Sequence, residues 1–319
     1  MKYLKHKTHV RKMTTAILIP CYNEEESIEK VITNFKHELP DADIYVYDNN
    51  STDSTFKIAK ATGVIVKKEY KQGKGNVVRS MFRDIDADCY IIVDGDDTYP
   101  AESAKEIEKI ILSGDADMVV GDRLSSTYFT ENKRRFHNSG NKLVRKFINS
   151  IFNSDLKDIM SGYRGFNYDF VKSIPISSKE FEIETEMTVF ALNHNFNIKE
   201  IVVNYKDRGE NSYSKVSTYK DGYKIISLIF SLFRDTRPLF YFSLVTLALF
   251  IIAIIYFIPI LMNFLQTGYV ERVPTLIIIS MVVIIGIITF LTGVILHVLK
   301  KQRFENFEHH LTLIRRNKK

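Results

Sequence analysis

The sequence predicts an α/β domain with a mainly parallel β-sheet, followed by two transmembrane α-helices. Before about residue 238 of the 319-residue chain, short apolar runs alternate with segments of helical periodicity. This alternation is typical of a parallel sheet covered by helices on both faces. Two nearly charge-free stretches follow at residues 239–262 and 275–299. Each is long enough to cross a hydrocarbon core about 30 Å thick.

The predicted strands are short runs rich in β-branched and aromatic residues. We expect them at residues 17–20, 44–47, 64–66, 90–93, 118–120 and 198–205. Apolar residues at helical spacing predict helices between them, and residues 158–165 are predicted to be a loop. Polar residues at 22–24, 48–53 and 94–97 each directly follow a strand. In open parallel sheets, ligands bind in the crevice beyond the carboxyl ends of the strands.

The charge pattern indicates a membrane surface rather than a nucleic acid as partner. The net charge is +6, and basic residues cluster at the N-terminus, at Arg234 and Arg237, and in residues 300–319. Because these clusters flank the apolar stretches, the positive-inside rule places both termini and the large domain in the cytosol. The two cysteines, Cys21 and Cys89, lie in or beside apolar runs and are expected to be buried free thiols in a reducing compartment.

The chain therefore divides into five predicted segments. Residues 1–14 form a basic N-terminal segment, 15–215 a cytosolic domain, 216–237 a juxtamembrane helix, 238–299 a transmembrane hairpin and 300–319 a basic cytosolic tail. Aromatic and aliphatic residues recur at helical spacing between Tyr219 and Phe233, opposite lysines. This pattern fits an amphipathic helix at the membrane interface, and a packed core helix is the alternative. The apolar spans also offer surfaces for a homo-oligomer.

An acidic cluster, Asp94-Gly95-Asp96-Asp97, ends the predicted strand at residues 90–93. Carboxylates this close repel one another unless a cation lies among them. Mg²⁺ is typically held by one or two carboxylates together with phosphate oxygens. The alternative is a solvated turn that caps the helix predicted to start near Ala101.

Several motifs, taken in order and spacing, resemble the family 2 inverting glycosyltransferases, and within them the dolichyl- or polyprenyl-phosphate sugar synthases. The motifs are Ile19-Pro20-Cys21-Tyr22-Asn23-Glu24-Glu25, Asp48-Asn49-Asn50-Ser51-Thr52-Asp53, Gly73-Lys74-Gly75 and Asp94-Gly95-Asp96. The resemblance covers about residues 14–220, and the paired C-terminal spans match several bacterial members. It implies a GT-A-like nucleotide-binding domain.

The resemblance also implies roles in binding a nucleotide-sugar donor. Pro20, Tyr22 and Glu24 would cradle the nucleoside, and Asp48 would accept hydrogen bonds from the N–H groups of uracil or guanine. Lys74 would place a positive charge between two glycines that allow close backbone approach, unless this segment is a flexible surface turn.

The acidic cluster would bind Mg²⁺ or Mn²⁺ on the donor diphosphate through Asp94 and Asp96. Relatives often have a glutamine at the position of Thr98, whose shorter side chain puts a direct metal contact in doubt. Asp97 is a candidate catalytic residue with Asp94 and Asp96, although a helix cap is the favoured interpretation for it.

Three cations are the candidates for the acceptor phosphate: Arg164, Arg208 and Lys215. An arginine fork suits a phosphate because it donates two parallel hydrogen bonds. Glu184 is the candidate for a sugar contact. It lies between Glu182 and Glu186, and acids in the first turn of a helix also occur there for the helix dipole alone.

These features predict a membrane-anchored enzyme that transfers one sugar from a UDP- or GDP-sugar to polyprenyl (undecaprenyl) phosphate, with inversion, at the cytosolic face. One alternative is a glycosyltransferase with another membrane-bound acceptor in envelope polysaccharide assembly. The processive form is disfavoured because its Gln-x-x-Arg-Trp motif requires a tryptophan, and the chain has none. A non-catalytic membrane binding protein is the alternative from another class.

Overall fold

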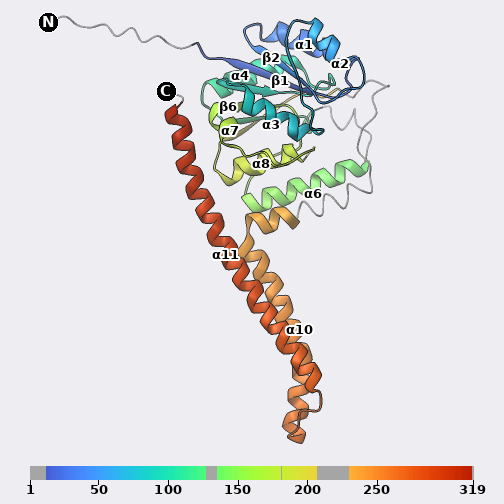
Figure 1. Cartoon of the computed structure of the whole chain (residues 1–319), viewed down its shortest axis with the longest axis vertical. Helices are drawn as coiled ribbons and strands as arrows, with labels where there is room; N and C mark the ends of the chain where they lie inside the picture. Colours follow the sequence, from blue (N-terminus) through green and yellow to red (C-terminus); the bar gives the residue numbers. More distant parts are fainter. Residues whose placement is uncertain (1–11, 127–134, 181, 207–229, 318–319) are drawn as a thin grey trace, which may run out of the picture. The chain divides into compact units, whose positions relative to one another are not determined.

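The computed structural model describes residues 12–126, 135–180, 182–206 and 230–317. The chain forms two compact units (Figure 1). The first comprises residues 1–216 together with 311–319, and the second comprises residues 217–310.

The first unit is built on one seven-stranded sheet. Its strand order is β3 (Ile65–Lys68), β2 (Asp43–Asp48), β1 (Thr15–Cys21), β4 (Cys89–Ile92), β6 (Arg164–Asn167), β5 (Met118–Asp122) and β7 (Ile198–Val202). All pairs are parallel except those that β6 makes with β4 and β5. The mainly parallel sheet predicted from the sequence is therefore confirmed.

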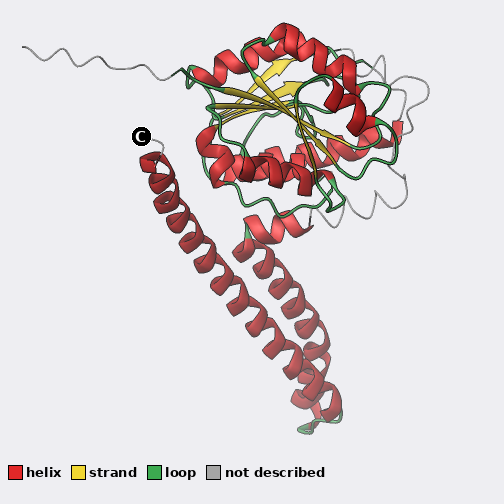
Figure 2. Ribbon diagram, turned by 45° about the horizontal axis from the view of Figure 1, so that its top comes forward, coloured by secondary structure: helices red, strands yellow, loops and turns green. Residues whose placement is uncertain are grey.

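Helices cover the sheet on both faces (Figure 2). In chain order they are α1 (Ile28–Glu38), α2 (Thr55–Ala61), α3 (Lys74–Asp84), a 3₁₀ turn (Ala101–Ser103), α4 (Ala104–Leu112), α6 (Arg135–Phe152), α7 (Tyr168–Ser173) and α8 (Ile183–Asn193). Residues of α1 and α4 pack with Ile17 and Ile19 in one buried cluster. On the other face, Phe82 of α3 and Phe170 of α7 pack against Phe166 of β6.

Strand β6 corrects the predicted loop at residues 158–165, because its first residues, Arg164 and Gly165, already pair with β4 and β5. Its composition gives no strand signal, since arginine and glycine replace the usual β-branched residues. Successive residues of a strand face opposite sides of the sheet. Gly165 accordingly faces α4 and Phe166 faces α7. A Cβ atom at Gly165 would lie 2.1 Å from Ile107 Cγ2, so α4 can pack this closely only against glycine.

We expect Gly165→Ala to destabilise the first unit by about 1–3 kcal/mol, the cost of overpacking a filled core. The measurement is the free energy of unfolding in denaturant. Gly114→Ala is the control, because Gly114 has a positive φ of 77° but no atom within 4 Å of its added Cβ. The loss of unfolding free energy in Gly114→Ala therefore reports backbone strain alone. Equal stability of Gly165→Ala and the wild type would contradict the close packing of α4 on β6.

The second unit contains the helices α10 (Pro238–Thr267) and most of α11 (Val273–Asn317). Both are long and apolar enough to cross a membrane. They pack through small residues, because a Cβ at Gly286 would lie 2.6 Å from Phe250 and one at Gly293 would lie 2.6 Å from Phe242. The Thr246 hydroxyl donates a 3.2 Å hydrogen bond to the Gly286 carbonyl, which also joins the two helices.

The predicted juxtamembrane helix lies largely outside the described residues, which resume at 230 and are helical from 230 to 236. The predicted basic tail is not a separate segment, because α11 continues to Asn317. The last residues of α11, 311–317, belong to the first unit. There, Arg315 Nε donates a 2.7 Å hydrogen bond to Asp169 Oδ2 of α7.

Candidate active site

The carboxyl ends of β1, β2 and β4 lie next to one another and carry the predicted site residues. Cys21 at the end of β1 is in register with Asp48 at the end of β2. Leu18 of β1 pairs with Ile92, the last residue of β4, and Asp94 follows two residues later. The parallel sheet thus gathers these polar strand ends at one edge, as expected from the sequence.

A buried ion cluster joins three elements at this edge. Lys74 Nζ, at the start of α3, lies 2.6 Å from Asp94 Oδ1 and 2.6 Å from Glu184 Oε1 at the start of α8. The Lys74 and Glu184 side chains are only 11% and 6% exposed. Burial disfavours the charged ammonium, but the two carboxylates outweigh that effect and raise the pKa of Lys74 above its ordinary value. Lys74 is therefore positively charged at neutral pH, and the flexible-turn alternative is wrong.

The loop before β6 closes on this cluster. A Cβ atom at Gly162 would lie 2.4 Å from Asp94 Oδ2 and 3.1 Å from Lys74 Nζ. The Gly162 N–H donates a 3.0 Å hydrogen bond to the Tyr99 hydroxyl. Arg123 Nε donates to Asp158 Oδ2 at 2.8 Å, which fixes the start of the same loop. Sequence reasoning missed Arg123, because it belongs to no motif with a defined spacing.

Thr98, which stands where relatives often have a glutamine, orients Asp96. The Thr98 hydroxyl donates a 2.7 Å hydrogen bond to Asp96 Oδ1, and Thr98 itself is 2% exposed. The short side chain thus orients a carboxylate. The Thr98 hydroxyl is thus engaged with Asp96, which is consistent with the expectation that the shorter side chain does not itself contact a metal.

Asp97 is not a helix cap, so the favoured interpretation is wrong. Neither the 3₁₀ turn that begins at Ala101 nor α4 has a side-chain cap at its N-terminus. Asp97 instead has a left-handed backbone with φ of 56° and forms an ion pair with Lys30 of α1. This geometry turns its carboxylate toward α1. The alternative of an acidic turn that caps the helix fails for the same reason.

Asp48 has the chemistry expected of a base-binding residue. It is fully buried, and its Oδ2 accepts a 3.3 Å hydrogen bond from the Ser51 N–H. Its Oδ1 has no hydrogen-bond partner among the described residues. A buried carboxylate oxygen without a donor is costly, and such groups are nearly always satisfied in native proteins. Because Oδ1 has no exposed surface in this structure, a ligand N–H would supply the missing donor only after the residues that cover Asp48 move.

The other predicted nucleoside contacts come from the end of β1 and the loop after it. Pro20 is buried within β1, whereas Tyr22 and Glu24 are half-buried. The loop is tied to the start of α2, because the Glu24 N–H donates a 2.8 Å hydrogen bond to the Thr55 hydroxyl. The predicted residues are therefore brought to one edge, with Tyr22 and Glu24 partly accessible.

The glycines beside Lys74 are required by a neighbouring segment of the protein. A Cβ at Gly73 would lie 2.2 Å from the Lys179 carbonyl oxygen, and one at Gly75 would lie 2.2 Å from that of Ser178. The Gly75 N–H donates to the Lys179 carbonyl at 3.0 Å. The glycines therefore admit the backbone of residues 178–179, whereas the predicted approach was that of a donor.

Arg164 does not contact the acceptor phosphate in this arrangement, so that prediction is wrong. Its side chain is fully buried. The guanidinium donates to the carbonyls of Ser161 and Ile159, and to the Thr188 hydroxyl at 2.9 Å. Burial lowers the pKa of Arg164 to about 10, which leaves it charged at neutral pH. The other two candidates, Arg208 and Lys215, lie outside the described residues.

We expect Arg164→Lys to lower the free energy of unfolding by at least about 2 kcal/mol, because buried carbonyls lose their donors. Donor binding by the folded fraction should be unchanged. Denaturant unfolding and nucleotide titration measure the two effects. Wild-type stability combined with loss of transfer would instead restore Arg164 as a phosphate ligand.

The acids of α8 have separate contacts. Glu184 belongs to the ion cluster, and Glu186 accepts hydrogen bonds from the backbone N–H groups of Ser177 and Ser178 at 2.8 and 2.9 Å. Glu182 is half-buried at the helix N-cap, without a side-chain cap hydrogen bond.

The described residues contain no group of three or more His, Cys, Asp or Glu side chains that could hold a metal ion. The metal site predicted at Asp94 and Asp96 would therefore rest on two protein carboxylates. Two carboxylates fit Mg²⁺ or Mn²⁺ when substrate phosphate oxygens and water complete the coordination. This donor set suits a metal that binds together with a diphosphate.

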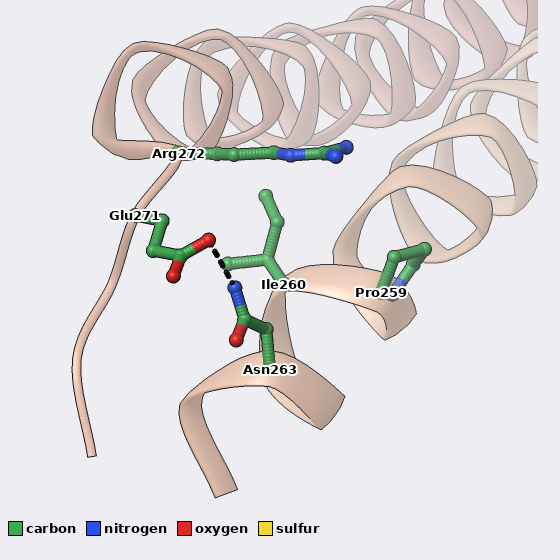
Figure 3. Close-up of a pocket in the computed structure, with 5 residues that line it drawn as sticks. All are labelled: Pro259, Ile260, Asn263, Glu271 and Arg272. Carbon is green, nitrogen blue, oxygen red and sulfur yellow. Dashed lines mark hydrogen bonds between the residues drawn. The ribbon is translucent and has the colours of Figure 1, made fainter. Parts of the chain in front are cut away.

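A pocket of about 250 Å³ lies in the second unit, near the connection between α10 and α11 (Figure 3). It is lined by Pro259, Ile260, Asn263, Glu271 and Arg272. Asn263 Nδ2 donates a 2.8 Å hydrogen bond to Glu271 Oε2 across it. None of the predicted site residues lines this pocket, so it is separate from the ion cluster.

Comparisons with known proteins identify the family of the chain. Residues 16–174 match the model of glycosyl transferase family 2. Glycosyltransferase AglJ of Haloferax volcanii is 32% identical over 73% of this chain and 76% of its own length. The dolichyl-phosphate hexose transferase of the same organism is 25% identical over 60% of this chain and 83% of its own length.

The solved structures include glucosyl-3-phosphoglycerate synthase of Mycobacterium tuberculosis in complex with Mn²⁺, UDP-glucose and phosphoglyceric acid. It is similar with a TM-score of 0.55 at 18% identity, over 70% of this chain and 79% of that chain. This similarity confirms the GT-A-like fold. The chain belongs to glycosyl transferase family 2, and it is a glycosyltransferase.

Proposed function

We propose that the protein transfers a single sugar from a UDP- or GDP-sugar to polyprenyl phosphate, with inversion, at the cytosolic face of a membrane. Family membership supports sugar transfer. The similarity to a dolichyl-phosphate hexose transferase supports a polyprenyl phosphate acceptor. The two long apolar helices support a membrane location, where such a lipid is found.

The observation that carries the donor assignment is the unpartnered Oδ1 of buried Asp48. Both uracil and guanine present ring N–H groups, and a carboxylate is an acceptor only. Asp48 would thus bind either base, and it would reject a base whose hydrogen-bonding edge offers only acceptors. Tyr22 and Glu24 would line the nucleoside from the neighbouring strand end.

The donor diphosphate would lie toward the ion cluster. Asp94 and Asp96 would hold Mg²⁺ or Mn²⁺, which as a Lewis acid would offset the charge that develops on the leaving nucleotide. Lys74 contacts Asp94 and brings one further positive charge to this side of the site. Thr98 would keep Asp96 Oδ1 in a fixed direction. Both contacts are made within the protein itself, so they would preorganise the site for the metal.

The acceptor needs orientation more than deprotonation, because a lipid phosphate is already anionic at neutral pH. Its oxygen would attack the anomeric carbon opposite the leaving diphosphate, which inverts the configuration. The bond from the sugar to the nucleotide breaks as the bond to the lipid phosphate forms. Arg208 and Lys215 remain the candidates that neutralise the acceptor, and a catalytic role of Asp97 would require its carboxylate to leave Lys30.

The proposed membrane topology has two spans, with the catalytic domain and both termini in the cytosol. The basic flanks of the apolar helices support this orientation. It places the active site on the same side of the membrane as the nucleotide-sugar pool.

The acceptor is tested with purified protein, Mn²⁺ and a panel of UDP- and GDP-sugars. We expect release of UDP or GDP to depend on added undecaprenyl phosphate and not on undecaprenol, which lacks the phosphate. Nucleotide release that is equal with both lipids would overturn the lipid-phosphate assignment.

A further inference from the structure

We propose that Glu184 is a positioning residue that acts through Lys74, and that it does not contact the sugar. Glu184 holds the Lys74 ammonium beside Asp94 and so controls how strongly Asp94 can bind the metal and the donor diphosphate. This inference rests on the proposed function, because it assigns a role within the same donor site.

The contacts show why Glu184 acts on Lys74. The two residues are 110 positions apart in the chain, yet Lys74 Nζ lies 2.6 Å from Glu184 Oε1. The ammonium bridges two carboxylates, and the second is Asp94, also at 2.6 Å. The Glu184 side chain is 6% exposed, whereas that of Asp94 is 26% exposed. Asp94 is therefore the partner that a ligand can reach, and Glu184 is the partner that anchors the lysine from the protein side.

The backbone around the ion cluster is fixed on both sides. Residues 176–179, which lead into α8, lie against the first turns of α3. Arg79 Nε donates a 2.7 Å hydrogen bond to the Ile176 carbonyl, and the Gly75 N–H donates to the Lys179 carbonyl. Glu186 accepts from the N–H groups of Ser177 and Ser178. Because these contacts join the start of α8 to the start of α3, Glu184 and Lys74 are held at a set separation.

The charge of the cluster gives Glu184 its effect on Asp94. One ammonium and two carboxylates carry a net charge of −1, so the cluster keeps a negative charge for a cation. If Glu184 is removed, Lys74 neutralises Asp94 alone, and the net charge becomes zero. A metal would then compete with an ammonium that has no second partner. Groups that orient a metal-ligating carboxylate typically change metal affinity by about 10–100-fold when mutated.

The experiment is a double-mutant cycle of Glu184→Met and Lys74→Met in the full-length protein. Mn²⁺ affinity is measured by electron paramagnetic resonance in the presence of UDP and, separately, of GDP. Glu182→Met is the matched control. It removes the same charge from the N-cap of α8, two residues before Glu184, and the described ion pairs of Lys74 do not include Glu182. Thermal unfolding of each variant reports structural effects separately.

We expect Glu184→Met to weaken Mn²⁺ binding by about 10-fold or more and the control to leave it within about twofold, the range of ordinary surface substitutions. Glu184→Gln should recover part of the loss, because its amide oxygen still accepts a hydrogen bond from Lys74. In the Lys74→Met background, Glu184→Met should have a much smaller effect on Mn²⁺ affinity, because the ammonium that Glu184 holds beside Asp94 is absent. The double variant also removes both members of the pair, so it guards against misfolding caused by one unpaired buried charge.

Multiplied effects of the two single variants would overturn the inference, since Glu184 would then act independently of Lys74. Wild-type Mn²⁺ affinity in Glu184→Met, with a changed preference among donor sugars, would also overturn it in favour of a direct sugar contact. A wild type that binds Mn²⁺ with neither UDP nor GDP would contradict the proposed function as well. The two failures are therefore distinguishable.

Discussion

Asp96→Asn is expected to reduce sugar transfer by about 10²–10³-fold, the usual cost of losing one preorganised electrostatic contact to a transition state. The amide keeps the size of the side chain and can still accept from the Thr98 hydroxyl, so the local geometry should persist. The lost property is the negative charge that would bind the metal. Binding of UDP or GDP without metal should remain, because Asp48 is unaffected.

Transfer from labelled donors and nucleotide titration, with and without Mn²⁺, measure these two properties. Asp41→Asn is the control, because Asp41 has a side chain that is 83% exposed and forms a surface ion pair with Lys12. Its transfer rate should equal that of the wild type. If Asp96→Asn transferred sugar at the wild-type rate, the metal assignment at the acidic loop would be withdrawn.

Asp48→Asn is expected to weaken donor nucleotide binding by about 10–100-fold, since a hydrogen bond to a charged group contributes about 1.5–3 kcal/mol. The fully buried carboxylate has one oxygen, Oδ1, without a donor among the described residues. An amide can present an NH₂ group at that position, which would face the N–H of the base instead of accepting from it. The loss should appear in KM for the donor rather than in kcat.

Calorimetric titration with UDP and GDP measures the loss and also identifies the base. Asp53→Asn is a useful comparison, because Asp53 follows the same strand but its Oδ1 accepts a 3.0 Å hydrogen bond from the Thr55 N–H. Unchanged affinity of Asp48→Asn for both nucleotides would show that Asp48 does not bind the base.

The parts of the fold that were predictable from the sequence are those with local signals. The apolar runs that became β1, β2 and β4 are bounded by polar residues, and each ends near the predicted position. Strand β6 has no such signal, because Arg164 and Gly165 are selected by their neighbours: Arg164 by buried carbonyls and Gly165 by Ile107 of α4. Such tertiary requirements leave no periodicity in the chain.

The same distinction applies to the site. Asp48, Lys74 and Asp94 could be singled out because they follow strands or lie in a glycine motif. The pairing of Lys74 with Glu184 could not be predicted, because the two residues are 110 positions apart. Arg164 was misassigned because an arginine in a polar motif looks like a phosphate ligand until its burial is known.

The most direct test of the central claim is the fate of a labelled sugar. Membranes containing the protein are incubated with labelled UDP- and GDP-sugars, Mn²⁺ and undecaprenyl phosphate, and the products are partitioned between organic solvent and water. Sugar transfer to the lipid phosphate predicts label in the organic phase that requires both the added lipid and an intact Asp96. Label found only in water-soluble products, with no lipid-extractable sugar, would contradict it.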